Sequence, residues 1–187
     1  MRTTWRWPRD HDESDLIVSE MDEVIPALVA AVQEQHATGD HYRDDAIRQA
    51  MEHQAQLALR PGPVRVDVIV DPPWSDGQIN SVQVVTGDRP FLVDTVASCL
   101  LRHGWRVEDV RHPIIGVKRD RGTIEAVGMP GRGGCASESW IHIDATAPLG
   151  TDIGQAAEQL RDDLCACLDQ VVCATDDWGA MHEAMLR

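Results

Sequence analysis

The sequence predicts an α+β fold in which helices pack on a mostly antiparallel sheet. Residues 64–70 alternate valine with other residue types at a period of two, which is typical of a strand. Residues 91–103 place apolar side chains three and four positions apart, which is typical of a helix. The length of 187 residues suits one domain with additional helices better than two domains that each need a core.

Residues 1–60 form a predicted amino-terminal helical segment. Apolar residues recur at helical spacing over residues 14–36, where Pro26 either kinks the helix or begins a second one. Another helical pattern extends from about Tyr42 to Leu59, and the prolines and glycine of residues 60–63 end it.

Two predicted strands follow, at Val64–Val70 and Ile79–Thr86, separated by a proline-rich loop over residues 71–77. The turn of residues 87–90 then precedes a helix from Phe91 to about His103, and Gly104 stands at the position that commonly ends a helix. The predicted buried stripe of this helix is Leu92, Val96, Cys99 and Leu100.

The second half of the predicted sheet comes next. A long strand over Arg106–Lys118 is followed by a turn at Arg119–Gly122 and a short strand over Thr123–Val127. A glycine-rich loop over 128–136 leads to the last strand, Trp140–Ala145, in which isoleucines alternate with polar residues.

A final helix runs from about Asp152 to Trp178. We assign these elements to the β-α-β-β-α-β order of the ferredoxin-like split unit, in which both helices cover one sheet face and the other face is left for water or a partner. The strand at residues 64–70 and the amino-terminal helices are additions to this core. The chain is thereby divided into residues 1–60, residues 61–150 with the strand and the core, and residues 151–187 with the last helix and a helical linker.

The composition excludes several classes of function. A formal net charge of -14 disfavours nucleic acid and anionic membranes as partners. The start of the chain lacks the apolar region of a signal peptide, so we expect a cytoplasmic location. The five cysteines have no framework spacing, and Cys165 and Cys167 point apart on a helix, so we expect reduced thiols and no metal site.

Catalytic sites are not indicated by the pattern. The glycine-rich run of residues 128–134 joins two strands, whereas a dinucleotide-binding loop must open a helix. The cysteines and histidines are not ordered as nucleophile, base and orienting group. His112 and His142 can be neighbours across the sheet, where they form either a pH-sensitive pair or two locally bonded histidines. With Trp140 they mark an interface, which the amino-terminal helices or another subunit should cover.

The turn from Asp88 to Phe91 lies between a strand end and a helix start, where free N–H groups gather. It suits a carboxylate or another anion. The alternative is a capped helix start, with Asp88 satisfying the N–H groups and Pro90 preset for the first turn.

Several motifs in this region resemble those of ACT domains, and more specifically the amino-terminal ACT segment of large bacterial NAD-dependent glutamate dehydrogenases. That family typically has Asp-x-Pro-Phe-Leu-Val-Asp-Ser-Val at this helix, His-Pro on the next strand, Arg-Asp-x-x-Gly at the hairpin and Glu-Ser before the last strand. The corresponding positions are Asp88–Val96, His112–Pro113, Arg119–Gly122 and Glu138–Ser139. At the hairpin, one residue instead of two separates Asp120 from Gly122.

The resemblance extends from about Pro61 to Met181. It implies a regulatory or assembly domain of an enzyme that converts glutamate and NAD to 2-oxoglutarate, ammonia and NADH, with no catalytic, cofactor or metal site in this chain. The implied partners are other domains and subunits of the same dehydrogenase and a weak amino-acid effector. The alternative is a stand-alone amino-acid-sensing ACT protein.

ACT domains that bind amino acids commonly have glycine after the proline of this turn, where this sequence has Phe91. We therefore expect no tight amino-acid binding, and we expect the Phe91 side chain to pack inward or at a domain contact. The candidate effector or contact loop comprises Asp88, Arg89, Pro90, Phe91, Leu92, Gly104 and Val107.

Overall fold

The computed structural model describes residues 17–18, 26–27, 29, 31, 44–75, 77–176 and 184–185. The helix expected over residues 14–36 is wrong at residues 17–18, which form a strand, whereas the described residues 26, 27, 29 and 31 are helical. The rest of that expected helix lies outside the described residues. The helix expected from Tyr42 to Leu59 is confirmed as α2, Asp44–Ala58.

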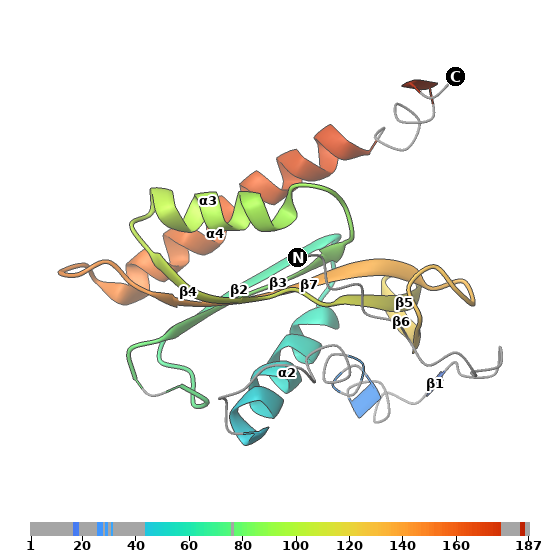
Figure 1. Ribbon diagram of the computed structural model, residues 1–187, viewed down its shortest axis with the longest axis horizontal. Helices are drawn as coiled ribbons and strands as arrows, with labels where there is room; N and C mark the ends of the chain where they lie inside the picture. Colours follow the sequence, from blue (N-terminus) through green and yellow to red (C-terminus); the bar gives the residue numbers. More distant parts are fainter. Residues whose placement is uncertain are drawn as a thin grey trace.

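An antiparallel sheet forms the centre of the molecule (Figure 1). Its order is β1-β6-β5-β7-β3-β2, and β4 also pairs with β7. The strands are β1 (Ile17–Val18), β2 (Val64–Ile69), β3 (Asn80–Gly87), β4 (Arg106–Arg111), β5 (Ile114–Asp120), β6 (Thr123–Gly128) and β7 (Ala136–Thr146). The last strand therefore begins at Ala136, and the glycine-rich loop is shorter than the sequence indicates.

The long strand predicted over residues 106–118 is divided into β4 and β5 at His112 and Pro113. Proline has no N–H to donate, so the ladder is interrupted there, although the Pro113 carbonyl oxygen still accepts a hydrogen bond from the Trp140 amide (3.0 Å). The register nevertheless continues across the break, because Arg111 pairs with His142 and Ile114 pairs with Ser139 of the same strand, β7.

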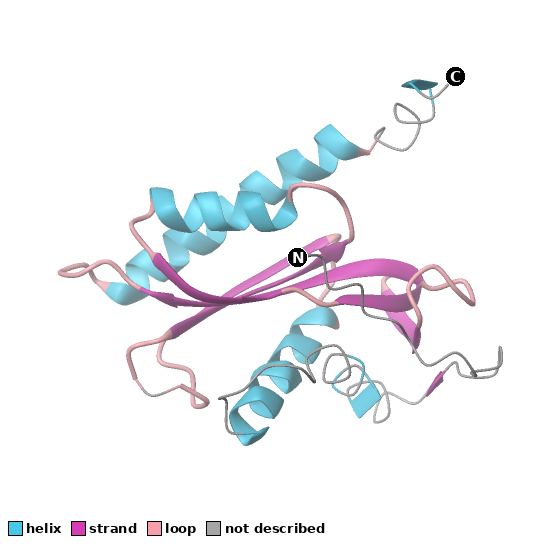
Figure 2. Ribbon diagram, in the orientation of Figure 1, coloured by secondary structure: helices cyan, strands magenta, loops and turns pink. Residues whose placement is uncertain are grey.

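Helices cover both faces of the sheet (Figures 1 and 2). Helices α3 (Leu92–Arg102) and α4 (Ile153–Thr175) lie on one face, and α2 lies on the other. The expectation that the second face is left for water or a partner is therefore wrong, because α2 occupies it. A separate hydrophobic cluster fills each of the two layers between helices and sheet.

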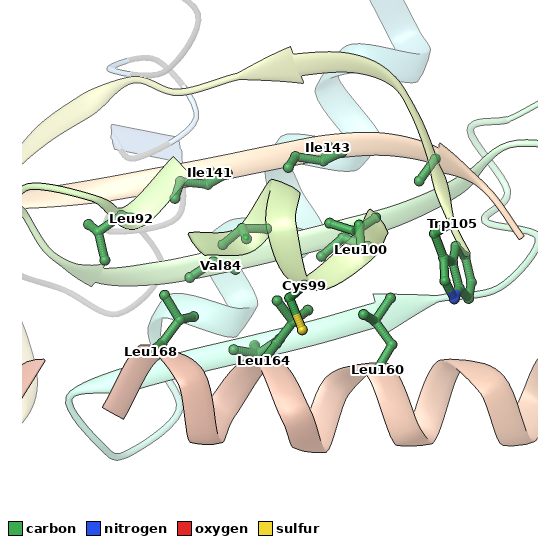
Figure 3. Close-up of a cluster of buried hydrophobic side chains, with 14 of the residues drawn as sticks. Val84, Leu92, Cys99, Leu100, Trp105, Ile141, Ile143, Leu160, Leu164 and Leu168 are labelled. Carbon is green, nitrogen blue, oxygen red and sulfur yellow. The ribbon is translucent and has the colours of Figure 1, made fainter. Parts of the chain in front are cut away.

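The two clusters follow from the alternation of side chains along each strand. Val84 and Ile141 point to α3 and α4, whereas Val85 and Trp140 point to α2. Helix α4 contributes residues four positions apart, all with no exposed surface, and they face Cys99 and Leu100 of α3 (Figure 3). They are Leu160, Leu164 and Leu168.

The ferredoxin-like core is confirmed, with one change in the order of its elements. In the described part of the chain no strand follows α4, and β2 pairs with β3 at the edge where the last strand of a β-α-β-β-α-β unit would lie. Val66 of β2 is buried in the α3–α4 cluster. The strand at residues 64–70 is thus part of the core, and describing it as an addition is wrong.

Candidate functional site at the turn before helix α3

The turn between β3 and α3 is anchored to β7. The Asp88 amide donates to the Ser137 carbonyl oxygen (2.8 Å), and the Ser139 hydroxyl donates to Asp88 Oδ1 (2.7 Å). The expectation that Asp88 caps α3 is wrong, because the N-cap residue is Phe91 and it makes no side-chain cap hydrogen bond. The Asp88 carboxylate instead binds a hydroxyl that is distant in sequence.

Arg89 connects the same turn to the carboxyl end of α4. Its Nη1 donates to the Val172 carbonyl oxygen, Thr175 Oγ1 and Asp176 Oδ1, each at 3.2 Å. Helix α4 has no basic residue in its last turn. Arg89 therefore supplies the positive charge that stabilises the negative end of the helix dipole.

Phe91 adopts the left-handed conformation, with φ 72° and ψ 4°. Non-glycine residues seldom adopt this conformation, because Cβ then crowds the following carbonyl oxygen. The side chain is 56% exposed, so of the two expectations for it inward packing is wrong, whereas a contact with another domain stays a prediction. The position where amino-acid-binding ACT domains commonly have glycine is thus in a conformation that glycine favours, although it carries a large apolar side chain that faces outward.

The remaining residues of the candidate loop do not form one site with the turn. Leu92 is buried in the α3–α4 cluster, and Pro90 is partly buried. Gly104, with φ 74°, follows the opposite end of α3, and Val107 pairs with Ala145. A helix of 11 residues is about 16 Å long, which separates Gly104 from the turn.

The motif at Glu138 and Ser139 is bound by two others, the hairpin motif through Arg119 and the turn before α3 through Asp88. Arg119 of the hairpin donates to both carboxylate oxygens of Glu138, through Nε at 2.6 Å and Nη2 at 3.0 Å. The same Nη2 donates to the Ala58 carbonyl oxygen at the end of α2 (3.1 Å). Ser139, next to Glu138, binds Asp88 as described above. These contacts between the three motifs therefore fix β5, β7, α2 and the turn before α3 to one another.

Comparison with protein families identifies this arrangement. The family model described as the glutamate dehydrogenase ACT1 domain matches residues 27–164. The chain belongs to this family. A comparison with curated proteins finds no match.

The ACT1 domain also contains a buried polar network between its sheet and α2, centred on His142. The His142 ring lies 3.0 Å from Ser81 Oγ, 3.2 Å from Gln83 Nε2 and 3.0 Å from Asp144 Oδ1. Burial lowers the pKa of His142, although the hydrogen bond to Asp144 opposes this effect. The histidine is therefore held in its neutral form at neutral pH.

The network continues to α2 through Gln83. Its side chain binds the His53 ring (2.8 Å) and donates to the Ala50 carbonyl oxygen (2.9 Å). On the same face, Gln54 donates to the Ile141 carbonyl oxygen (2.9 Å). These glutamines position α2 on the sheet, a role that helical periodicity alone did not indicate.

Of the three residues proposed as an interface, Trp140 and His142 are buried under α2, and His112 lies elsewhere. Trp140 has no exposed surface and packs in the α2 cluster, and His142 is 5% exposed. An amino-terminal helix is thus the cover of this face, and neither residue is accessible to another subunit. His112 lies at the break between β4 and β5, where partial desolvation lowers its pKa and Asp88 opposes that shift. The hydrogen-bond partners of His142 are Ser81, Gln83 and Asp144, and His112 is not among them.

Other expected sites can be compared with the described residues. Within the described ranges there is no cluster of three or more histidine, cysteine, aspartate or glutamate residues suited to a metal ion. The same part of the chain has no helix of sufficient length and apolarity to span a membrane. The glycine-rich loop joins β6 to β7.

Proposed function

We propose that this ACT1 domain is a regulatory or assembly part of a large NAD-dependent glutamate dehydrogenase. The parent reaction is the conversion of glutamate and NAD to 2-oxoglutarate, ammonia and NADH. In this proposal the catalytic residues and NAD belong to another part of the protein. The glycine-rich loop supports this assignment, because it lies between two strands, and a loop that cradles dinucleotide phosphates must lead into a helix.

The observation that carries the proposal is the outward orientation of Phe91. The polar side chains beside it are engaged within the domain, Asp88 with Ser139 and Arg89 with the end of α4. The turn thus serves as an internal clamp, and the Phe91 ring is its large exposed apolar side chain. Aromatic residues such as phenylalanine are enriched at contacts between proteins relative to the rest of the surface. We assign Phe91 to a contact with another domain or subunit of the same cytoplasmic dehydrogenase.

The alternative function is a stand-alone amino-acid sensor. It is favoured by the left-handed backbone at Phe91, because this conformation is typical of glycine, the residue that amino-acid-binding ACT domains commonly have at this position. The phenyl ring opposes it, since it occupies space beside that backbone. A weak amino-acid effector is compatible with the regulatory assignment, whereas tight binding by the isolated domain would favour the sensor.

Thermal unfolding of the chain with each common amino acid separates these functions. A ligand at about 100 times its Kd stabilises a folded protein by about 2.7 kcal/mol, which raises the unfolding midpoint by several degrees in a domain of this size. We expect no such rise. A rise that disappears in Asp88→Ala would instead identify the turn as an effector site. NADH titration should likewise give no saturable fluorescence enhancement with this chain.

The contact role of Phe91 is tested in the full-length dehydrogenase. We expect Phe91→Ser to weaken subunit assembly, measured by light scattering, or to change the response to effectors, measured by steady-state kinetics. Leu101→Ser is the matched control, because Leu101 is 67% exposed on the outer side of the same helix. Equal behaviour of wild type, Phe91→Ser and Leu101→Ser in both assays would contradict the assignment.

A further inference from the structure

Two cysteines face each other where α3 packs on α4. The helices run antiparallel, because Arg89 before α3 binds Asp176 after α4, and His103 after α3 binds Asp163 within α4. This arrangement brings Cys99 of α3 next to Cys167 of α4. Figure 3 shows the Cys99 sulfur directed toward α4.

One guanidinium group joins the two thiols. Arg102 Nη2 lies 3.5 Å from Cys99 Sγ and 3.1 Å from Cys167 Sγ and donates a hydrogen bond to each. The thiolate is the nucleophilic form of cysteine, and a neighbouring arginine favours it. The positive charge of Arg102 therefore lies where the sulfur would carry negative charge during a reaction.

The two sulfurs differ in their access to solvent. Cys99 is 1% exposed, and its pKa is raised mainly by burial, with the hydrogen bond from Arg102 opposing and the contact with Cys167 adding to the rise. Cys167 is partly exposed. Both line an open groove of about 470 Å³ between the helices, together with Asp94, Ser98 and Arg102. A small oxidant can thus reach Cys167 first, while Cys99 is held beneath it.

We propose that Cys99 and Cys167 form a redox-sensitive pair, which a peroxide converts to a disulfide between α3 and α4. The Cys167 thiolate attacks one peroxide oxygen, the O–O bond breaks, and the departing hydroxide takes a proton to form water. The product is a sulfenic acid on Cys167. The Cys99 sulfur then attacks the Cys167 sulfur, the S–O bond breaks, and a second water leaves with the proton of Cys99. Two thiols are oxidised, and one peroxide is reduced to two waters.

Cys165 of the last helix is poorly placed for this reaction. Cys165 lies two positions before Cys167, so its side chain is rotated by about 200° around the helix. Burial raises its pKa, with Asp169 and Asp162 adding to the rise. Cys165→Ser is therefore the matched control, because it removes a partly buried thiol from the same helix and leaves the proposed pair intact.

The experiment treats the reduced chain with hydrogen peroxide under native conditions. The remaining thiols are then labelled with a maleimide in denaturant and analysed by mass spectrometry. We expect two of the five thiols to be lost together and a fragment containing Cys99 to be linked to Cys167. Reduction with dithiothreitol should restore both. The disulfide should also raise the unfolding midpoint, since it constrains the unfolded chain.

Variants distinguish this reaction from unspecific oxidation. Cys165→Ser should form the same disulfide at the wild-type rate, whereas Cys167→Ala should form none and Arg102→Gln should slow the reaction several-fold. Cys167 is partly exposed, so its alanine variant should fold even if a change at the buried Cys99 does not. The proposal is overturned if Cys167→Ala loses thiols as wild type does, if the disulfide joins Cys165 or Cys173, or if Cys167 proceeds to sulfinic acid while Cys99 stays reduced.

Discussion

Phe91 offers a direct test of the turn geometry, because its φ of 72° reverses the usual order of alanine and glycine. We predict that Phe91→Gly is more stable than Phe91→Ala. Both variants remove the exposed ring, so loss of its contacts affects them alike. They differ in Cβ, which alanine retains and glycine lacks.

The expected difference combines two opposing terms. A residue with Cβ loses about 1–2 kcal/mol in the left-handed region, whereas glycine avoids this cost. Glycine in turn loses about 0.5–1 kcal/mol relative to alanine, because its unfolded chain has more freedom. The net advantage of Phe91→Gly from these two terms is about 0–1.5 kcal/mol. Phe91 is also the N-cap residue of α3, where glycine is again preferred to alanine.

The assay is reversible thermal or urea unfolding of both variants, with the corresponding pair at Leu101 as the control. Leu101 is exposed near the end of α3, where glycine should be less stable than alanine by about 1 kcal/mol. The sign of the difference should therefore change between the two positions. In a domain of this size each kcal/mol shifts the midpoint by about 2–4 °C, which scanning calorimetry resolves.

An alanine variant at residue 91 that equals or exceeds the glycine variant would refute the reasoning. It would mean that the turn relaxes to a right-handed or extended conformation at little cost. The likeness of this turn to a glycine-containing effector turn would then have no energetic basis. At Leu101 the alanine variant is expected to be the more stable one, and that outcome reports only helix propensity.

Three further outcomes follow from the core and the polar network. Leu164→Ala should lower the free energy of unfolding by about 2–5 kcal/mol in urea titration, because Leu164 has no exposed surface and leaves a cavity. Burial lowers the pKa of His142, so the unfolded chain binds the proton more readily than the folded chain does. The free energy of unfolding should therefore fall as pH drops below about 6.5, the pKa of an unfolded histidine. His142→Gln should flatten this dependence. Arg89→Ala should lower the unfolding midpoint by more than Arg89→Lys does, since lysine retains the charge at the end of α4; equal midpoints would contradict the dipole argument.

Most helices and strands could be predicted because the pattern that specifies each of them lies within the element itself. The period-two valines of residues 64–70 and the stripe of α3 are read within a few residues, and both agree with the structure. The break between β4 and β5 was less evident, because Pro113 interrupts pairing while the register on β7 continues. Helix α2 was predicted, and the amino-terminal helices were one of two expected covers for the Trp140 face; choosing between a helix and another subunit required contacts between distant segments.

The candidate site was harder to predict for the same reason. Asp88 and Pro90 resemble a helix start, and only the proximity of Ser139 shows why the carboxylate turns away from the helix. The role of Arg89 depends on the end of α4, which lies more than 80 positions further along the chain. A weak signal was present in the sequence, since α4 lacks a basic residue in its last turn and must obtain its positive partner elsewhere.

The position of β2 shows why periodicity cannot determine the order of strands in a sheet. Seven of the eight residues of β3 are buried, so this strand needs a neighbour on each edge. Alternating valines identify residues 64–69 as a strand but do not say which strand it pairs with. In the structure β2 pairs with β3 residue by residue from Val64–Thr86 to Ile69–Ser81. It thereby protects an edge that would otherwise be open to pairing with another chain. Strand β2 thus completes the core that supports the turn before α3.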